Sequence, residues 1–247
     1  LIAFLAGCAA GLCTALLNTM LGIPGILAGI LTQLALYSVY LDINGKANAP
    51  VSVDKFPLVI SSRYVTAGNE VVDIIRTVGT ALLFVVLIIA ALYWFFGTEY
   101  GMAIRATGCN SAMSKAEGIN TKRTTIIALV LSNGMVGLAG ALLAQYQGFS
   151  DINIGRGAIV IGLAAVIIGE AVFSRIFQNF ALKLVSVSLG AIIYYIVIQL
   201  VLTLGFDANL LKLLSASVVA VFLAVPYWKG KYFSKPVKKA KEDAKNA

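Results

Sequence analysis

Residues 77–98 read TVGTALLFVVLIIAALYWFFGT, a run of 22 residues that contains no charged side chain. As an α-helix this run is about 33 Å long at 1.5 Å per residue, close to the bilayer's apolar thickness of about 30 Å. A similar stretch, residues 157–174, is broken only by Glu170, and four further runs are uncharged throughout: residues 1–41, 124–150, 184–206 and 213–228. The first of these is long enough for two helices. The sequence therefore predicts an all-α, polytopic bundle of seven transmembrane helices.

We place the crossings at residues 1–20, 21–41, 77–97, 124–146, 157–174, 184–205 and 211–228. Residues 1–228 thus form a transmembrane domain, with loops at 42–76 and 98–123, and residues 229–247 form a basic tail. Leu1 opens directly on an apolar run without an initiator methionine. We expect a truncated N-terminus, with further residues upstream.

Composition excludes several classes of protein. The chain is 60% hydrophobic and 12% charged, with a mean hydropathy of +0.91, whereas soluble domains carry about 25% charged residues. It contains no histidine, which removes histidine-dependent catalytic triads and histidine metal ligands. Its three cysteines form no Cys-x-x-Cys pair, and no phosphate-binding loop is present. We therefore expect no catalytic residue, no metal site and no ATP hydrolysis by this chain.

The distribution of lysine and arginine predicts the orientation. With the tail in the cytoplasm, the inner segments 98–123, 175–183 and 229–247 carry 13 Lys and Arg, and the outer segments carry 6. Basic residues concentrate on the cytoplasmic side of membrane proteins. The sequence therefore predicts a cytoplasmic tail, a cytoplasmic loop 98–123 and an external loop 42–76. The external loop is either a docking surface or a solvated linker, and it ends in a helical lead-in that Asn69 is placed to cap.

Small residues four apart predict close helix packing, because they let backbones approach within the membrane. They are Gly7 with Gly11, Gly25 with Gly29, and Asn133 with Gly137, although small residues are also simply common in membrane helices. Pro24 lies between glycines and predicts a broken or late-starting helix. It either lines a water-filled pathway or marks a plain helix start.

The loop 98–123 encodes a small helix over residues 110–117. Asn110 or Ser111 is placed to cap its first amides, and Gly118 is placed to end it in a left-handed conformation. Ala112, Met113 and Ala116 supply an apolar side. A helix of about two turns is not stable alone in water, so it must rest on the membrane domain or on a partner.

The sequence Arg105-Ala106-Thr107-Gly108-x-Asn110 with Gly118-Ile119 resembles the permease subunits of ATP-binding-cassette (ABC) importers of the branched-chain amino acid and ribose type. The resemblance is strongest to a subgroup associated with tryptophan or tyrosine uptake, and it extends over nearly the whole chain. It includes Ile23-Pro24, Leu27–Thr32, Ala35–Ser38, Gly45–Asn48, Ile167–Glu170 and Leu211–Leu213. The sequence departs from the family at Cys109, where many members carry an acidic residue, and the family normally has crossings before Leu1.

In that family the loop sits in a groove of a separate ATPase subunit. The resemblance thus implies coupling to the ATPase by Arg105, Ala106, Gly108, Asn110, Ala112, Met113, Lys115 and Gly118. It also implies that ATP and magnesium bind to the partner ATPase and that this chain binds no cofactor.

Glu170 is the one acidic residue inside a predicted crossing, and we expect it to be a buried charge with a partner. It forms either an ion pair with Arg175 or Lys183 or part of the transport pathway. Neutral polar groups in other crossings either line a pathway for an amino acid or bond between helices. The pathway candidates are Pro24, Gln33, Tyr37, Asn133 and Gln199, and Gln145 belongs to the same polar set.

Two functions remain open. The first is a permease subunit of an ABC importer for a branched-chain or aromatic amino acid. It would work in a bacterial inner or plasma membrane with a cytoplasmic ATP-binding subunit, an external substrate-binding protein or lipoprotein and a second permease copy, and without nucleic acid. The second is a self-contained secondary transporter or channel, which inverted repeats would favour. An embedded enzyme is disfavoured because it would need an unusual base.

Overall fold

The computed structural model describes residues 1–51, 70–173 and 179–204, together with Leu213, Ala216, Ser217, Ala220 and Ala224. The chain divides into two compact units, Leu1–Arg156 and Gly157–Ala247, and each is described by itself.

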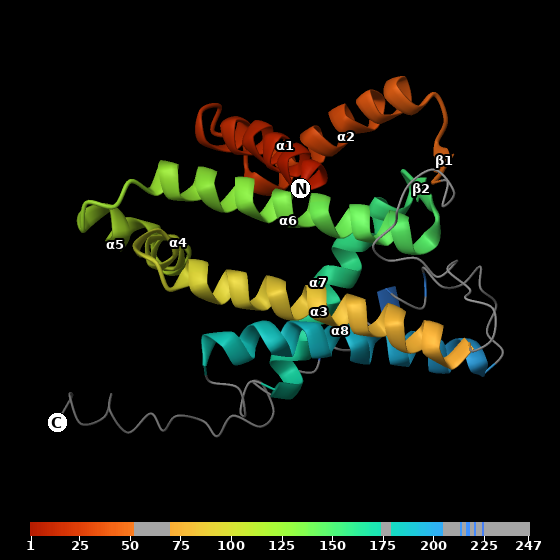
Figure 1. Ribbon diagram of the computed structural model, residues 1–247. Coiled ribbons are helices and arrows are strands. Elements are labelled where there is room, and N and C mark those ends of the chain that lie inside the picture. Colours follow the sequence, from red (N-terminus) through yellow and green to blue (C-terminus); the bar gives the residue numbers. More distant parts are fainter. Residues whose placement is uncertain are drawn as a thin grey trace. The chain divides into compact units, whose positions relative to one another are not determined.

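Helices form almost all of the regular structure (Figure 1). The first unit contains α1 (Ile2–Thr19), α2 (Gly25–Asn44), β1 (Asn48–Pro50), α3 (Glu70–Phe96), α4 (Glu99–Cys109), α5 (Ser111–Ala116), α6 (Thr121–Gln147) and β2 (Phe149–Asp151). The helix α7 (Ile154–Phe173) begins at the end of this unit and continues into the second, which also holds α8 (Phe180–Thr203).

Five of the described helices are long and apolar enough to span a membrane: Ile2–Thr19, Gly25–Asn44, Ile74–Phe96, Thr121–Gln147 and Phe180–Thr203. A shorter apolar helix covers Ile161–Phe173. The predicted all-α polytopic fold is therefore confirmed, and six of the predicted crossings correspond to α1, α2, α3, α6, α7 and α8. The seventh, residues 211–228, and the external residues 52–69, including Asn69, fall outside the described ranges apart from the single positions named above.

Two element boundaries differ from the prediction. Helix α3 begins at Glu70 rather than at residue 77, because the charged lead-in continues the same helix. At 27 residues it is about 40 Å long, so its first turns extend beyond an apolar layer of about 30 Å. The loop 98–123 contains two helices, α4 and α5, where the sequence predicted one.

Backbone contact between glycines holds α1 against α6. A Cβ atom added to Gly11 would lie 2.7 Å from the Leu129 carbonyl oxygen, and one added to Gly137 would lie 3.1 Å from the Gly7 Cα. Real side chains do not fit at these distances, so only glycine allows this approach. The predicted packing by Gly7, Gly11 and Gly137 is confirmed. The pair Gly25 and Gly29 makes no such close contact within the described chain.

A short connection joins α1 to α2 and ends at Pro24, which is the N-cap of α2. The Asn18 side-chain amide donates to the Ile23 carbonyl oxygen at 2.8 Å and closes the connection. Farther along the two helices, the Thr14 hydroxyl donates to the Thr32 Oγ1 at 2.9 Å in a buried position. This hydrogen bond holds α1 to α2. It matters in a membrane because apolar side chains have no hydrophobic driving force to pack together in lipid.

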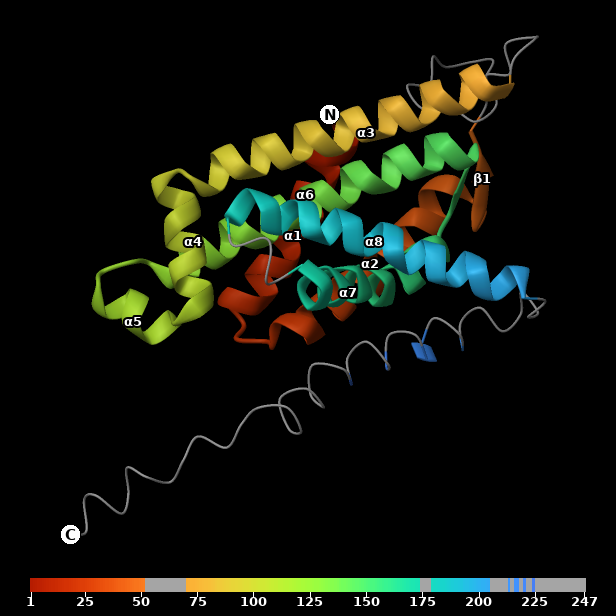
Figure 2. The same ribbon diagram turned by 90° about the horizontal axis from the view of Figure 1, so that it is seen from below.

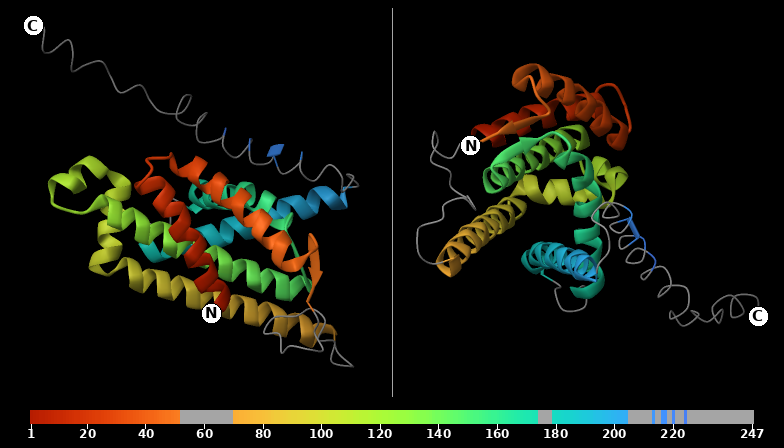
Figure 3. Two further views of the ribbon diagram at one scale, coloured as in Figure 1. Left: turned by 90° about the horizontal axis from the view of Figure 1, so that it is seen from above. Right: turned by 90° about the vertical axis from the view of Figure 1, so that its right-hand side faces the viewer.

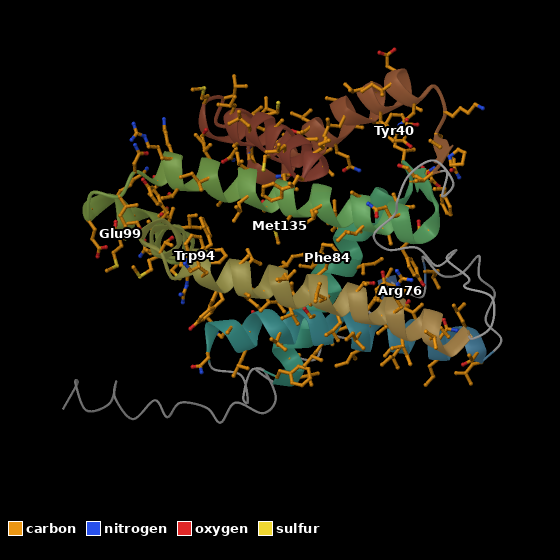
Figure 4. The ribbon with its side chains drawn as sticks, viewed as in Figure 1. Tyr40, Arg76, Phe84, Trp94, Glu99 and Met135 are labelled. Carbon is orange, nitrogen blue, oxygen red and sulfur yellow. The ribbon has the colours of Figure 1, made fainter. Side chains whose placement is uncertain are left out.

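Two of the segments predicted to be external, residues 42–76 and 147–156, meet in a small antiparallel ladder. Strand β1 pairs with β2, with Asn48 opposite Asp151 and Pro50 opposite Phe149. The Tyr40 hydroxyl donates to the Ser150 carbonyl oxygen at 3.0 Å beside this ladder. Figures 2 and 4 show that the ladder and Tyr40 lie at one end of the first unit, while α4, α5 and Glu99 lie at the opposite end. Segments predicted to lie on opposite sides of the membrane are thus at opposite ends of the first unit.

In the second unit, α7 packs against α8 through small residues. The backbone at Gly169 lies against the Ser186 carbonyl, and Gly190 lies against the Ala165 carbonyl. Ala164, Ile168 and Tyr194 form the buried cluster beside these glycines. This unit therefore has a tightly packed helix pair of the same kind as α1 with α6.

Candidate functional site

A sharp turn separates α4 from the membrane helix α3. The Thr98 Oγ1 accepts a hydrogen bond from the Gly101 amide at 3.3 Å and donates to the Phe95 carbonyl oxygen at 2.6 Å. Gly101 is buried, and a Cβ there would collide with the backbone of Phe95 and Phe96. Glycine at position 101 therefore permits the chain to leave α3 and start α4 at once.

Helix α5 is capped at both ends as predicted. The Asn110 Oδ1 accepts hydrogen bonds from the amides of Ala112 and Met113, each at 3.1 Å. At the other end, Gly118 has a φ of 85°. The Gly118 amide bonds to the Lys115 carbonyl at 3.1 Å and the Ile119 amide to the Ser114 carbonyl at 3.0 Å, which is a Schellman motif. The sequence prediction for both helix ends is confirmed.

The sequence left open whether the apolar side of α5 rests on the membrane domain or on a partner, and in the first unit α5 packs inward through Ser114 instead. Ser114 is only 2% exposed, and its hydroxyl donates to the Asn110 carbonyl oxygen at 3.0 Å. Ala112, Met113 and Ala116 are all exposed, and Met113 is 59% exposed. The apolar side therefore points away from the rest of the first unit. Ser114 allows α5 to approach the rest of the first unit more closely than Met113 would, because the serine side chain is small and its hydroxyl bonds to its own helix.

The other predicted coupling residues also lie on the outside of this region. Arg105, Gly108, Asn110, Lys115 and Gly118 are exposed, whereas Ala106 is half-buried. A Cβ added to Gly108 would meet no atom within 4 Å. The structure thus brings seven of the eight residues onto the exposed surface of two consecutive helices at one end of the unit (Figure 3).

A pair of hydroxyls, which the sequence did not indicate, joins α4 to α6. The Thr107 Oγ1 lies 3.2 Å from the Thr124 Oγ1, and Thr124 is 6% exposed. The N-cap of α6 is Asn120, whose Oδ1 accepts from the Arg123 amide at 3.2 Å. An asparagine just before a run that turns apolar is the signal that would have located this cap.

Within the first unit, the predicted pathway residues Pro24, Gln33, Tyr37 and Asn133 do not form one group. Pro24 is exposed at the start of α2, and Gln33 and Tyr37 lie one turn apart on that helix, exposed and half-buried. Asn133 instead belongs to the α1–α6 contact: its Cβ lies 2.8 Å from where a Gly11 Cβ would stand, and its amide donates to the Leu129 carbonyl oxygen. Asn133 therefore serves the close helix packing predicted for it with Gly137, and its hydrogen bond lies within α6 rather than between helices. Gln199 is exposed on α8 in the second unit.

Most of the chain matches a known family. The model of the branched-chain amino acid transport system / permease component family matches residues 1–226. This chain belongs to that family. The permease is therefore a multi-pass membrane protein of a family of transport-system permease components, and the resemblance seen in its loop 98–123 is confirmed.

Named relatives agree with this assignment. A tyrosine transport system permease protein of Clostridioides difficile is 37% identical over 224 residues, which are 91% of this chain and 71% of that protein. An autoinducer 2 import system permease protein of Yersinia pestis is 30% identical over 172 residues, 68% of this chain and 45% of the relative. An inner membrane ABC transporter permease protein of Escherichia coli is 25% identical over 168 residues, 68% of this chain and 49% of the relative. No solved structure matches the chain.

The expected buried charge at Glu170 is not found in this permease chain. The Glu170 side chain is exposed, whereas Ala164, Ala165, Ile168 and Gly169 form the buried face of α7. Position 170 lies about a quarter turn beyond Gly169 and so misses the contact with α8. Lys183 is also exposed, and Arg175 falls outside the described residues. The ion pair and the transport role of Glu170 stay predictions.

Proposed function

We propose that the chain is the membrane-spanning subunit of an ATP-driven importer and that the end of α4 and the helix α5, residues 105–118, form its contact with a separate cytoplasmic ATPase. The observation that carries the proposal is the exposed apolar side of α5. A six-residue helix does not persist in water without support. Capping and the inward-facing Ser114 hold it in place, yet Ala112, Met113 and Ala116 remain uncovered. A partner that covers these side chains accounts for both features.

The chain forms the pathway and the coupling surface, and the partner ATPase hydrolyses ATP. ATP and magnesium bind to the partner ATPase, and no cofactor is assigned to this chain. Closure of the ATPase would pull on α5 and tilt the membrane helices between outward-open and inward-open states. The Arg105, Lys115 and Gly108 positions lie on the same exposed surface and are available to contact that partner.

An amino acid is the proposed substrate class. The family description names branched-chain amino acids, and the Clostridioides difficile relative is named for tyrosine. Gln33 and Tyr37, one turn apart on α2, are the residues proposed to face the pathway. An extracytoplasmic binding protein would deliver the substrate at the end that carries the β1–β2 ladder. A second permease copy would complete the enclosure.

The proposed location is a bacterial inner or plasma membrane with the C-terminal tail in the cytoplasm. Support comes from the basic residues, 13 of which fall in the predicted inner segments against 6 in the predicted outer segments. The orientation also places the exposed side of α5 where an ATPase subunit can reach it.

Two methionines of similar exposure provide the test. Met113 on α5 is 59% exposed and Met102 on α4 is 54% exposed. The permease would be reconstituted in vesicles with its ATPase and binding protein, and uptake of labelled tyrosine, tryptophan or leucine measured with and without ATP. Met113→Ala should reduce ATP-driven uptake and the recovery of the ATPase with the permease by about tenfold, the scale of a lost interface anchor. Met102→Ala should leave both near the unsubstituted level.

Uptake without nucleotide or ATPase would instead support the self-contained transporter or channel. Equal effects of Met113→Ala and Met102→Ala on a working importer would show that α5 is not the contact.

A further inference from the structure

A hydroxyl pair forms the bond between the region that carries the exposed α5 and the membrane helix α6. Thr107 belongs to α4 and Thr124 to the first turn of α6, and their Oγ1 atoms are 3.2 Å apart. Thr124 is 6% exposed and Thr107 is half-buried, so water has little access to the contact. Hydrogen bonds at low-dielectric positions hold geometry more firmly than exposed ones.

Both hydroxyl hydrogens have an acceptor in this contact. Thr107 can donate to the Ala103 carbonyl oxygen at 2.8 Å, and Thr124 can donate to the Thr121 carbonyl oxygen at 2.9 Å. Each threonine has one hydrogen and two acceptor lone pairs. When one hydroxyl donates to its own helix, the other is therefore free to donate across the gap. Both arrangements keep α4 and α6 joined without a charge or a water molecule.

The contact continues from α6 into the membrane. Helix α6 meets α1 backbone to backbone through Gly7, Gly11 and Gly137. Backbone contacts of this kind leave no side chain that can change rotamer and absorb a displacement. A displacement of α4 that the threonine pair passes to α6 must therefore also move α1.

We propose that Thr107 and Thr124 are positioning residues that transmit movement of the α4–α5 region to the paired helices α6 and α1. This inference rests on the proposed function, in which a partner ATPase pulls on α5. The hydrogen bond between Thr107 and Thr124, which we call the threonine joint, stays formed throughout the transport cycle. Helices α4, α6 and α1 therefore move as one body. Without the joint, α4 turns about its connections while α6 stays in place.

Valine substitutions test transmission, because valine keeps the shape of threonine and removes the hydroxyl. In the reconstituted complex, Thr107→Val and Thr124→Val should lower the substrate imported per ATP hydrolysed by about two- to tenfold, the equilibrium equivalent of one hydrogen bond. ATP hydrolysis itself and binding of the ATPase should persist. Thr125→Val is the matched control, because the Thr125 hydroxyl bonds only to the Thr121 carbonyl within α6, at 2.8 Å. Thr124→Ser should restore coupling.

A disulfide tests whether the joint stays closed. Thr107→Cys and Thr124→Cys would be combined in a chain whose Cys8, Cys13 and Cys109 are replaced by alanine. The 3.2 Å separation of the present hydroxyls places the two sulfur atoms within reach of a bond after a small shift. Oxidation should leave ATP-driven uptake at the level of the reduced protein.

Loss of uptake on oxidation, recovered with a reductant, would show that the joint opens and would overturn the inference. So would import per ATP in the two valine variants equal to that of Thr125→Val; if the cysteines do not cross-link, this comparison decides alone. A complex that shows no ATP-driven uptake even without substitutions would instead refute the proposed function.

Discussion

Two asparagine side chains decide where the helices at the α4 end of the first unit begin. Asn110 caps α5 by two hydrogen bonds, and Asn120 caps α6 by one. The first was predictable because Asn110 precedes a short stretch that ends in a glycine. The Thr107–Thr124 contact was not predictable, because the two residues meet only after α4 and α6 fold back on each other. A helix cap can be predicted from neighbouring residues in the sequence, whereas a hydroxyl pair between two helices depends on how the helices pack.

Removing the Asn110 cap should loosen α5 specifically. Asn110→Ala leaves the amides of Ala112 and Met113 without a side-chain acceptor, at a cost of about 1 kcal/mol. Hydrogen exchange of residues 111–116, followed by mass spectrometry, should be roughly fivefold faster than in the unsubstituted protein. Asn110→Ser should show little change, since serine is also a good cap. Unchanged exchange in Asn110→Ala would mean that packing alone holds α5.

At the level of helices, small residues four apart predicted close packing but not which helices meet. Gly7 with Gly11 and Asn133 with Gly137 were marked by this spacing, and the structure shows that they join α1 to α6. Ala165 with Gly169 and Ser186 with Gly190 have the same spacing and join α7 to α8, but they were not singled out in advance. Helix α4 was missed because its glycines and charges resemble a loop, and the Thr98 cap and the turn at Gly101 make it a helix.

A matched pair of glycines on α6 tests the α1–α6 contact. Gly137 lies against Gly7 and Ala3, whereas a Cβ at Gly140 would meet nothing within 4 Å. Gly137→Ala should destabilise the folded permease by about 1–3 kcal/mol through overpacking. Gly140→Ala should be neutral or stabilise by up to about 1 kcal/mol, because alanine favours helix. Thermal unfolding in detergent would measure both, and equal midpoints would contradict the close approach of α1 to α6.

For the molecule as a whole, the distribution of charged residues predicted which segments lie together at each end of the first unit. The segments assigned to the outside pair with each other in the β1–β2 ladder, and the basic loop lies at the opposite end of the same unit. Hydropathy and charge are sufficient for this result because the bilayer imposes length and orientation on every helix. Which polar residues line a pathway could not be predicted this way, since that depends on the rotation of each helix.

Labelling from either side of the membrane tests the orientation. Lys46 lies between α2 and β1 and Lys115 lies on α5, and both are exposed. In a chain without its native cysteines, Lys46→Cys should react with an impermeant maleimide in right-side-out vesicles. Lys115→Cys should react only after permeabilisation. The reverse pattern would place α5 outside the cell and exclude its contact with a cytosolic ATPase.

The bond from Tyr40 to Ser150 spans 110 residues of sequence. At a synthesis rate of about 5–20 residues per second, roughly 5–20 s separate the appearance of the two partners from the ribosome. The membrane helices α1, α2, α3 and α6 must therefore be synthesised before the Tyr40–Ser150 bond can form. The ladder is a late step in biogenesis, and nascent chains stalled before β2 should expose the α2 terminus to external protease.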